Sequence, residues 1–217
     1  MQYEIKAVAF DAFGTLVEIH DKRRPYAKLA KAAAQPLARS PMCEPIELDA
    51  MVRLCGLTLE ASDMDVLYAD LQAELASTQP YPEAQGVLEE LRTLGIRTAV
   101  ASNLALPYAR PIEDKLGPLL DVSCMSFEVG FMKPDSGFYD ALCGRLQLLP
   151  QEVLMIGDTW RCDYEGATAA GLHAVHLNRR GNAEDHQLAV SATDLHGVLR
   201  YLKGPHTGLH PASAKSS

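Results

Sequence analysis

Short apolar runs separated by stretches of helical spacing are the main feature of this chain. Five runs have the length and composition of buried strands, and they cover residues 5–10, 97–102, 122–126, 153–157 and 173–177. Between most of them, apolar residues recur every three or four positions, as at Val87, Leu88, Leu91 and Leu94 or at Tyr139, Leu142 and Leu146. Alternating strands and helices predict an α/β fold of the Rossmann-like kind, a parallel sheet with helices on both faces.

The stretch from 18 to 80 interrupts this alternation. It contains no convincing strand, and its patterns predict helices over 25–37, 48–57 and 62–77, punctuated by prolines. We therefore expect an all-helical cap, residues 18–80, inserted after strand 1 of a core that spans 1–17 and 81–203. An insertion at that point would lie over the strand ends and act as a lid. Residues 204–217 are poor in core residues and are expected to form a flexible tail.

Composition narrows the functional classes. The chain has 217 residues, 47% of them hydrophobic and 22% charged, which is enough to bury a core. Its net charge of −8 argues against a nucleic-acid or anionic-membrane surface, but allows a small anionic substrate held by local cations. No run reaches the length of a membrane span, no leader peptide is visible, and the five cysteines include no CxxC pair. We expect a cytoplasmic protein with reduced thiols, either a monomer or a homodimer.

Polar residues stand at the ends of three predicted strands. Asp11 ends the apolar run in AVAFDAFGTLV (residues 7–17), Ser102 ends the run at 97–102, and Asp158 follows the run at 153–157. Parallel sheets bind ligands at the carboxyl ends of their strands, so these residues are expected to meet. Asp11 could be a nucleophile that forms a covalent ester, or it could cap a turn before Gly14. Ser102 could bind an anion or cap a helix.

Four motifs occur in a characteristic order: DAFGT at 11–15, SNL at 102–104, KPD at 133–135 and GDTWRCD at 157–163. In this order and spacing they resemble the haloacid dehalogenase superfamily of hydrolases, and the resemblance covers nearly the whole chain. It implies that Asp11 is the nucleophile and that Thr15, Ser102 and Asn103 hold the transferring group. It also implies that Lys133 neutralises the phosphate or the nucleophile.

The last motif indicates a metal. Asp158 and Asp163 converging with Asp11 would form an oxygen-rich site of the kind that suits Mg²⁺. The resemblance implies that the ligands are Asp11, Asp158 and the main-chain carbonyl of Phe13, with Asp163 supporting metal-bound water. The alternative is that Asp158 and Asp163 cap a helix.

Phe13 departs from the phosphatases of this family, which usually carry there a second aspartate that protonates the leaving group. General acid–base help contributes about 10²- to 10⁴-fold in rate. The favoured interpretation is an Mg²⁺-dependent phosphatase of small phosphorylated metabolites, working through an aspartyl-phosphate. Its leaving groups would be good ones, or the acid would come from the substrate or the cap, where His20 is a candidate.

Three alternatives remain open. A 2-haloacid dehalogenase would explain the aromatic residue at 13 and Tyr139, needs no metal, and requires a cap arginine, for which Arg23, Arg24 and Arg53 are candidates. Phosphonate cleavage would use a Schiff base on one of the cap lysines, Lys22, Lys28 or Lys31. Finally, the protein could be a binding or regulatory module that has kept the fold and lost turnover.

Overall fold

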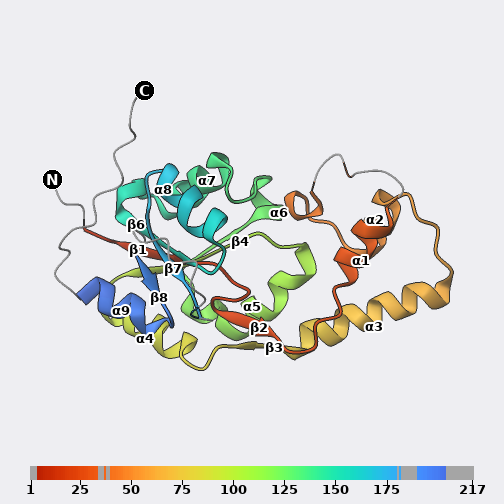
Figure 1. The fold of residues 1–217 in the computed structure, drawn as a ribbon, viewed down its shortest axis with the longest axis horizontal. Coiled ribbons are helices and arrows are strands. Elements are labelled where there is room, and N and C mark those ends of the chain that lie inside the picture. Colours follow the sequence, from red (N-terminus) through yellow and green to blue (C-terminus); the bar gives the residue numbers. More distant parts are fainter. Residues whose placement is uncertain (1–3, 34–36, 38–39, 180, 182–189, 204–217) are drawn as a thin grey trace.

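A parallel sheet of six strands forms the centre of the molecule in the computed structural model, which describes residues 4–33, 37, 40–179, 181 and 190–203. The strand order is β5-β4-β1-β6-β7-β8 (Figure 1). The strands are Ala7–Phe10 (β1), Arg97–Ser102 (β4), Val122–Met125 (β5), Val153–Gly157 (β6), His173–Leu177 (β7) and Ser191–Ala192 (β8). The five predicted strands are confirmed; β8 was missed because two residues are too few to show a period.

Helices cover both faces of the sheet, as predicted. Ala84–Thr93 (α4), Arg110–Leu116 (α5) and His196–Lys203 (α9) lie on one face (Figure 1). Ser136–Leu146 (α7) and Gly166–Ala169 (α8) lie on the other, and Ser126–Val129 (α6) follows β5. Each face has its own cluster of buried apolar side chains, and the alternate residues of β1 divide between the two, as strand geometry requires.

Strand β1 lies in the middle of the sheet and ends at Phe10, so Asp11 stands at the carboxyl end of the sheet. All four β1 residues are fully buried, and Phe10 pairs with Val100 of β4 and with Ile156 of β6. The Asp11 N–H continues the ladder by donating to the Ile156 carbonyl at 2.8 Å. Asp11 therefore lies between the carboxyl ends of β4 and β6, the two strands that flank β1.

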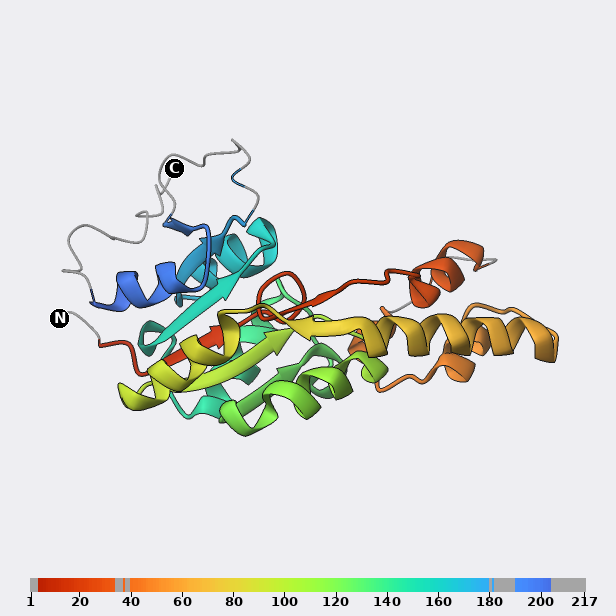
Figure 2. The same cartoon turned by 90° about the horizontal axis from the view of Figure 1, so that it is seen from below.

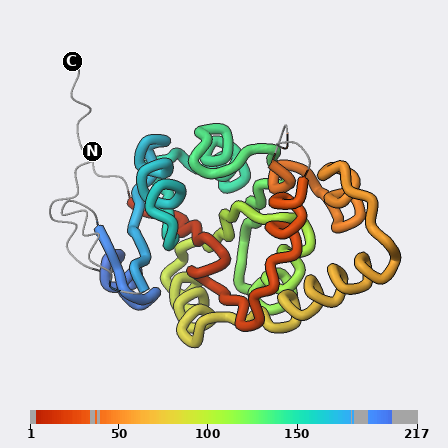
Figure 3. Tube along the Cα trace, turned by 45° about the vertical axis from the view of Figure 1, so that its right-hand side comes forward, coloured from red at the N-terminus to blue at the C-terminus, as the bar shows by residue number. Residues whose placement is uncertain are grey.

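A helical cap projects from the carboxyl end of the sheet. It consists of Pro25–Ala32 (α1), the short turn Pro41–Cys43 (η1), Leu48–Leu54 (α2) and the long helix Ala61–Ser77 (α3), which extends away from the core (Figures 2 and 3). The helices share a separate apolar cluster around Tyr26, Leu48 and Met51. Helix α2 ends before the predicted residue 57 because Gly56, with φ of +67°, reverses the chain.

The expectation that 18–80 holds no strand is wrong at both ends of that stretch. Val17–Ile19 (β2) and Thr78–Pro80 (β3) form an antiparallel pair where the chain leaves the core and returns to it. Each strand has three residues, too few to show an alternation of apolar and polar positions. The chain enters the cap along β2 (the first crossing) and leaves it along β3 (the return crossing), and the cap brings these two segments together. No described helix is long and apolar enough to cross a membrane. The predicted tail, 204–217, lies outside the described residues.

Candidate active site at the carboxyl end of the sheet

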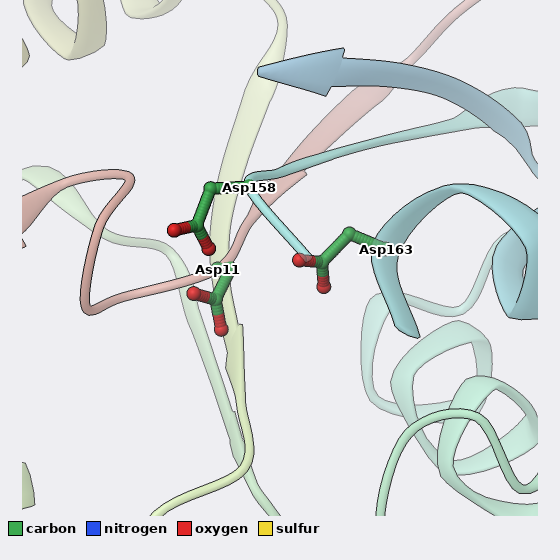
Figure 4. A group of neighbouring side chains, drawn as sticks. All are labelled: Asp11, Asp158 and Asp163. Carbon is green, nitrogen blue, oxygen red and sulfur yellow. The ribbon is translucent and has the colours of Figure 1, made fainter. Parts of the chain in front are cut away.

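Three carboxyl groups meet at the ends of β1 and β6. Asp11 and Asp158 directly follow these strands, and Asp163 returns from the turn after β6 (Figure 4). One oxygen of each of these aspartates lies within 4.8 Å of one of each of the others. The strand-end pattern predicted that Asp11 and Asp158 would meet, and the structure adds how Asp163 reaches them.

Lys133 joins two of these carboxylates. Its Nζ lies 2.9 Å from Asp11 Oδ1, 2.6 Å from Asp163 Oδ1 and 2.7 Å from the Ala101 carbonyl oxygen, at 2% exposure of the residue. An ammonium group has three donors, and all three are used here. Lys133 is thus a buried point charge that fixes the orientation of the Asp11 carboxylate.

The SNL motif holds the other side of Asp11. Ser102 Oγ donates to Asp11 Oδ1 at 3.0 Å, so this one oxygen accepts from both Ser102 and Lys133. The Asn103 side chain pairs with the backbone of Lys133 in both directions, each bond at 2.8 Å. Asn103 therefore positions the lysine rather than touching Asp11. No described donor reaches Asp11 Oδ2, which keeps its lone pairs for an incoming group.

A π-helical turn, Trp160–Glu165 (η5), places Asp163. The side chain is fully buried, and its Oδ2 accepts from the Thr159 N–H at 2.9 Å. Residue 157 must be small, because a Cβ on Gly157 would lie 2.1 Å from the Asp163 carboxyl carbon. The α-helix that follows, α8, begins three residues after Asp163, at Gly166.

Gly14 makes room for Asp158. Its φ is +91°, and a Cβ there would lie 2.3 Å from Asp158 Oδ2. Both the left-handed backbone and the close approach require glycine at this place in DAFGT. The preceding residue, Phe13, is held by the same turn and packs edge-on against Tyr108, with ring centroids 5.9 Å apart.

The cluster carries more negative than positive charge. Lys133 pairs with Asp11 and Asp163, whereas Asp158 has no ion-pair partner among the described residues. Burial and the charge of Asp11 raise the pKa of Asp158 above its usual range. Burial also raises the pKa of Asp163 to about 6, helped by Asp11 and opposed by Lys133. Burial lowers the pKa of Lys133, but Asp11 and Asp163 outweigh it, so the ammonium stays charged.

Thr15 and Phe13 were also expected in the site, and their surroundings differ. Thr15 is fully buried in the turn after Asp11, and its Oγ1 has no hydrogen-bond partner within the described chain. An unpaired buried hydroxyl is a donor left for a ligand. Phe13 is partly buried, and its ring packs against Tyr108.

A pocket of about 420 Å³ opens beside Phe13 and Asp158. The pocket is also lined by Lys22 from the first crossing, Tyr81 from the return crossing, His176 in β7 and Arg179 just beyond it. Its volume suits a small metabolite. Sequence reasoning missed Tyr81 and Arg179, although Arg179 stands just beyond the end of β7, the same signal that identified Asp158.

Most cap residues named for the alternative chemistries are engaged or exposed. Arg23 pairs with Asp21 and Asp70, and Lys28 also pairs with Asp70. The others are exposed, and they are Lys22, Arg24, Lys31 and Arg53. His20 is exposed, lies 3.6 Å from Glu18 and does not line the pocket.

Tyr139 is buried under the site rather than exposed in it. It is 1% exposed, packs against Phe138, and its hydroxyl donates to the Cys162 carbonyl. The Cys162 carbonyl belongs to the turn that carries Asp163. Tyr139 therefore supports the last motif from below.

Comparison with known families yields one match over most of the chain. The model of the haloacid dehalogenase-like hydrolases matches residues 5–171. Among curated proteins, the (S)-2-haloacid dehalogenase 4A of Burkholderia cepacia is 28% identical over 206 residues, which cover 85% of this chain and 88% of that protein. A glyceraldehyde 3-phosphate phosphatase of Methanothermobacter thermautotrophicus is 28% identical over 129 residues, or 56% of this chain and 57% of its own length.

Solved structures agree in fold. The crystal structure of a HAD phosphatase from Thermococcus onnurineus superimposes with a TM-score of 0.68 at 23% identity, covering 92% of this chain and 99% of that one. Relatives of both kinds, dehalogenases and phosphatases, are thus similar to this protein.

Proposed function

Because this chain belongs to the haloacid dehalogenase-like hydrolases, we propose that it is an Mg²⁺-dependent phosphohydrolase acting on small phosphorylated metabolites. The observation that carries this choice within the family is Asp158. It brings a third carboxylate to within 4.8 Å of Asp11 and Asp163, while the one ammonium of the cluster, Lys133, pairs with Asp11 and Asp163 and not with Asp158. A site with a surplus of two negative charges suits a divalent cation.

The residues fit Mg²⁺ by donor type. Asp11 and Asp158 would supply carboxylate oxygens, the Phe13 carbonyl would supply a third oxygen, and buried Asp163 would orient a water molecule next to the ion. Burial and the charge of Asp11 raise the pKa values of Asp158 and Asp163, so a divalent cation beside them would favour their ionised forms. When bound, the ion would shield the charge between Asp11 and an incoming phosphoryl group.

Asp11 is the proposed nucleophile. Its Oδ1 is held by Lys133 and Ser102, so the uncommitted Oδ2 attacks phosphorus and the bond to the leaving oxygen breaks. The Thr15 hydroxyl, which has no partner among the described residues, donates to the transferring group, and the Ser102 hydroxyl would join it only by releasing Asp11 Oδ1. Water then cleaves the aspartyl phosphate, releasing phosphate and restoring the carboxylate. Asn103 acts on this step through the backbone of Lys133.

Phe13 sets the expected substrate preference. No carboxylate stands at this position to protonate the leaving oxygen, so the leaving group departs as an anion. Esters of acidic alcohols, such as aryl phosphates and acyl phosphates, should react faster than alkyl phosphates, by up to the 10²- to 10⁴-fold that a general acid contributes.

A 2-haloacid dehalogenase is the second candidate. It is favoured by the aromatic residue at 13 and by the dehalogenase of Burkholderia cepacia, which is similar over 85% of this chain. Halide leaves without a proton, so that reaction needs no acid at 13. Against it stand Asp158, which a metal-free site does not need, and the absence of any described contact from a cap arginine to Asp11. The phosphonate route is less supported, since Lys22 is exposed and amine nucleophiles are activated by desolvation.

The test is a hydrolysis screen with matched metal conditions. Purified protein is incubated with an aryl phosphate, an alkyl phosphate, an acyl phosphate and 2-chloropropionate, each in Mg²⁺ and in chelator. Phosphate release that needs Mg²⁺ and favours the aryl or acyl ester supports the proposal. Halide release that is indifferent to chelator overturns it in favour of the dehalogenase. No turnover of any compound would leave the binding module as the better description.

A further inference from the structure

One arginine outside the four motifs contacts two segments that are distant from it in sequence. Arg179, just beyond the end of β7, donates from Nη2 to the Thr15 carbonyl at 2.7 Å and from Nε to the Gly14 carbonyl at 3.2 Å. Its Nη1 lies 2.6 Å from Glu83 Oε1, and its guanidinium carbon stacks 3.6 Å from the centroid of the Tyr81 ring. The side chain is 19% exposed.

The first segment that Arg179 contacts is the turn after the nucleophile. That turn is closed by N–H groups of residues 15, 16 and 17, which all donate to the Ala12 carbonyl. The carbonyls of Gly14 and Thr15 point elsewhere, and the hydrogen bonds they receive from described residues come from Arg179. The arginine therefore fixes the peptide planes that follow Phe13, in a turn where Gly14 already has a left-handed φ.

The second segment is the return crossing from the cap. Tyr81 and Glu83 follow β3 directly, and the Tyr81 N–H donates to the Leu16 carbonyl at 2.9 Å. Tyr81 and Arg179 both line the pocket that Phe13 and Asp158 border. A rotation of the cap relative to the core would move this crossing. Arg179 links the crossing to the backbone of Gly14 and Thr15.

We propose that Arg179 is a positioning residue that couples the return crossing of the cap to the turn carrying Phe13. It thereby fixes the orientation of the Phe13 main-chain carbonyl and of the Asp11 carboxylate. The planar fork of arginine suits this task, because it can donate to two carbonyls and one carboxylate while its face lies on an aromatic ring. The part of the proposal that concerns the Phe13 carbonyl as a metal ligand rests on the proposed function. The part that concerns the geometry of the turn does not.

The test compares Arg179→Met, Arg179→Lys and Glu83→Gln with the control Arg145→Met. Arg145 is a suitable match because it also bridges a carboxylate and a main-chain carbonyl, those of Glu128 and Ser123, in another part of the core. Four quantities are measured: kcat and KM for the best substrate of the wild type, Mg²⁺ affinity by calorimetry without substrate, and hydrogen exchange of the peptides spanning 12–20 and 78–85. Circular dichroism checks that each variant is folded.

We expect Arg179→Met to lower kcat at least tenfold with a smaller change in KM, and to weaken Mg²⁺ binding about 10- to 100-fold, as loss of a supporting contact does at other metal sites. Both peptides should exchange faster together. Arg179→Lys should recover part of kcat, and Glu83→Gln should loosen mainly the 78–85 peptide. The control should behave like the wild type.

Three outcomes would overturn the coupling. They are an unchanged kcat and Mg²⁺ affinity in Arg179→Met, an equal loss in Arg179→Met and Arg145→Met, or, in Arg179→Met, faster exchange in one peptide without the other. If the wild type turns over without Mg²⁺, the proposed function fails separately. The arginine is then judged on kcat for the observed reaction and on exchange at 12–20.

Discussion

The core and the cap each contain a pair of buried carboxylates, and the two pairs are balanced differently. On cap helix α3, Asp70 binds Lys28 and Arg23. Glu74, at 2% exposure, accepts the N–H groups of Arg23 and Arg24, each at 2.7 Å, and the Tyr108 hydroxyl. The bond from Lys28 holds the pKa of Asp70 below its usual range, whereas burial raises the pKa of Asp163 in the core.

The difference separates carboxylates that hold the cap together from carboxylates with the properties of a functional site. The two buried cap carboxylates each accept hydrogen bonds from several groups, and Glu74 joins helix α3 to the first crossing and, through Tyr108, to the core. The core carboxylates share one lysine and keep a surplus of negative charge beside a pocket. Carboxylates with raised pKa in a cleft are candidates for function, and compensated ones are candidates for structure.

The largest expected effect is on activity and comes from Asp11→Asn. The amide keeps an oxygen for Lys133 and Ser102 but cannot form the aspartyl ester, so turnover should fall on the order of 10⁴-fold or more. The free energy of unfolding should change little. Rates are measured with the best ester of the screen and stability by denaturant titration; residual activity near the wild type would rule out Asp11 as the nucleophile.

Lys133→Met should have the largest effect on stability. It leaves Asp11 and Asp163 buried without their cation, a loss of about 3–5 kcal/mol in the free energy of unfolding. Denaturant titration at neutral pH measures it. The double variant with Asp163→Asn should regain part of the loss, because one of the stranded charges is removed; additive losses would contradict the pairing.

In the cap, Glu74→Gln should cost stability more than chemistry. An amide can accept on one side, but its NH₂ group cannot accept from Arg23 and Arg24 or from Tyr108, so about 1–3 kcal/mol of unfolding free energy should be lost. We expect less than a tenfold fall in kcat. Tyr108→Phe is the matched variant, since it keeps the ring against Phe13 and removes only the hydroxyl. A loss of activity as large as that of Asp11→Asn would erase the distinction between the two pairs.

The smallest effect is a pH dependence of opposite sign in the two regions. Asp163 has a pKa of about 6 when folded and 3.8 as the reference value, so the folded state binds its proton more tightly. Its stabilising contribution is present below about pH 4 and is lost as pH rises through 6. The metal-free protein should therefore lose about 1 kcal/mol between pH 5 and 7.

For Asp70 the sign is reversed: its lowered pKa stabilises the fold above the unfolded value and is lost only as pH falls below it. Urea midpoints measured in chelator from about pH 2.5 to 7.5 test both statements, because the range extends below the unfolded pKa of Asp70 and above the folded pKa of Asp163. Asp163→Asn should flatten the fall toward neutral pH, and a slope that survives this substitution would assign it to another group.

Local patterns in the chain were sufficient for the sheet and for part of the site. Apolar runs marked five strands, and a parallel sheet necessarily gathers their carboxyl ends, so Asp11, Ser102 and Asp158 had to lie near one another. Gly14 in DAFGT and Gly157 in GDTWRCD mark close backbone approaches that a side chain would block, here of Asp158 and Asp163 respectively. These features depend on residues close together in sequence or on a general property of parallel sheets.

No local pattern in the sequence predicted the contacts between distant segments. Strands β2 and β3 form only where the two crossings meet, and Glu74 is buried only because Tyr108 and the first crossing close over it. Tyr139 has the spacing of a site residue but supports the last motif from beneath, and Arg179 reaches the turn after Asp11 across 164 positions of sequence. Side-chain direction and long-range pairing follow from packing in three dimensions, which a one-dimensional pattern of polar and apolar residues does not encode.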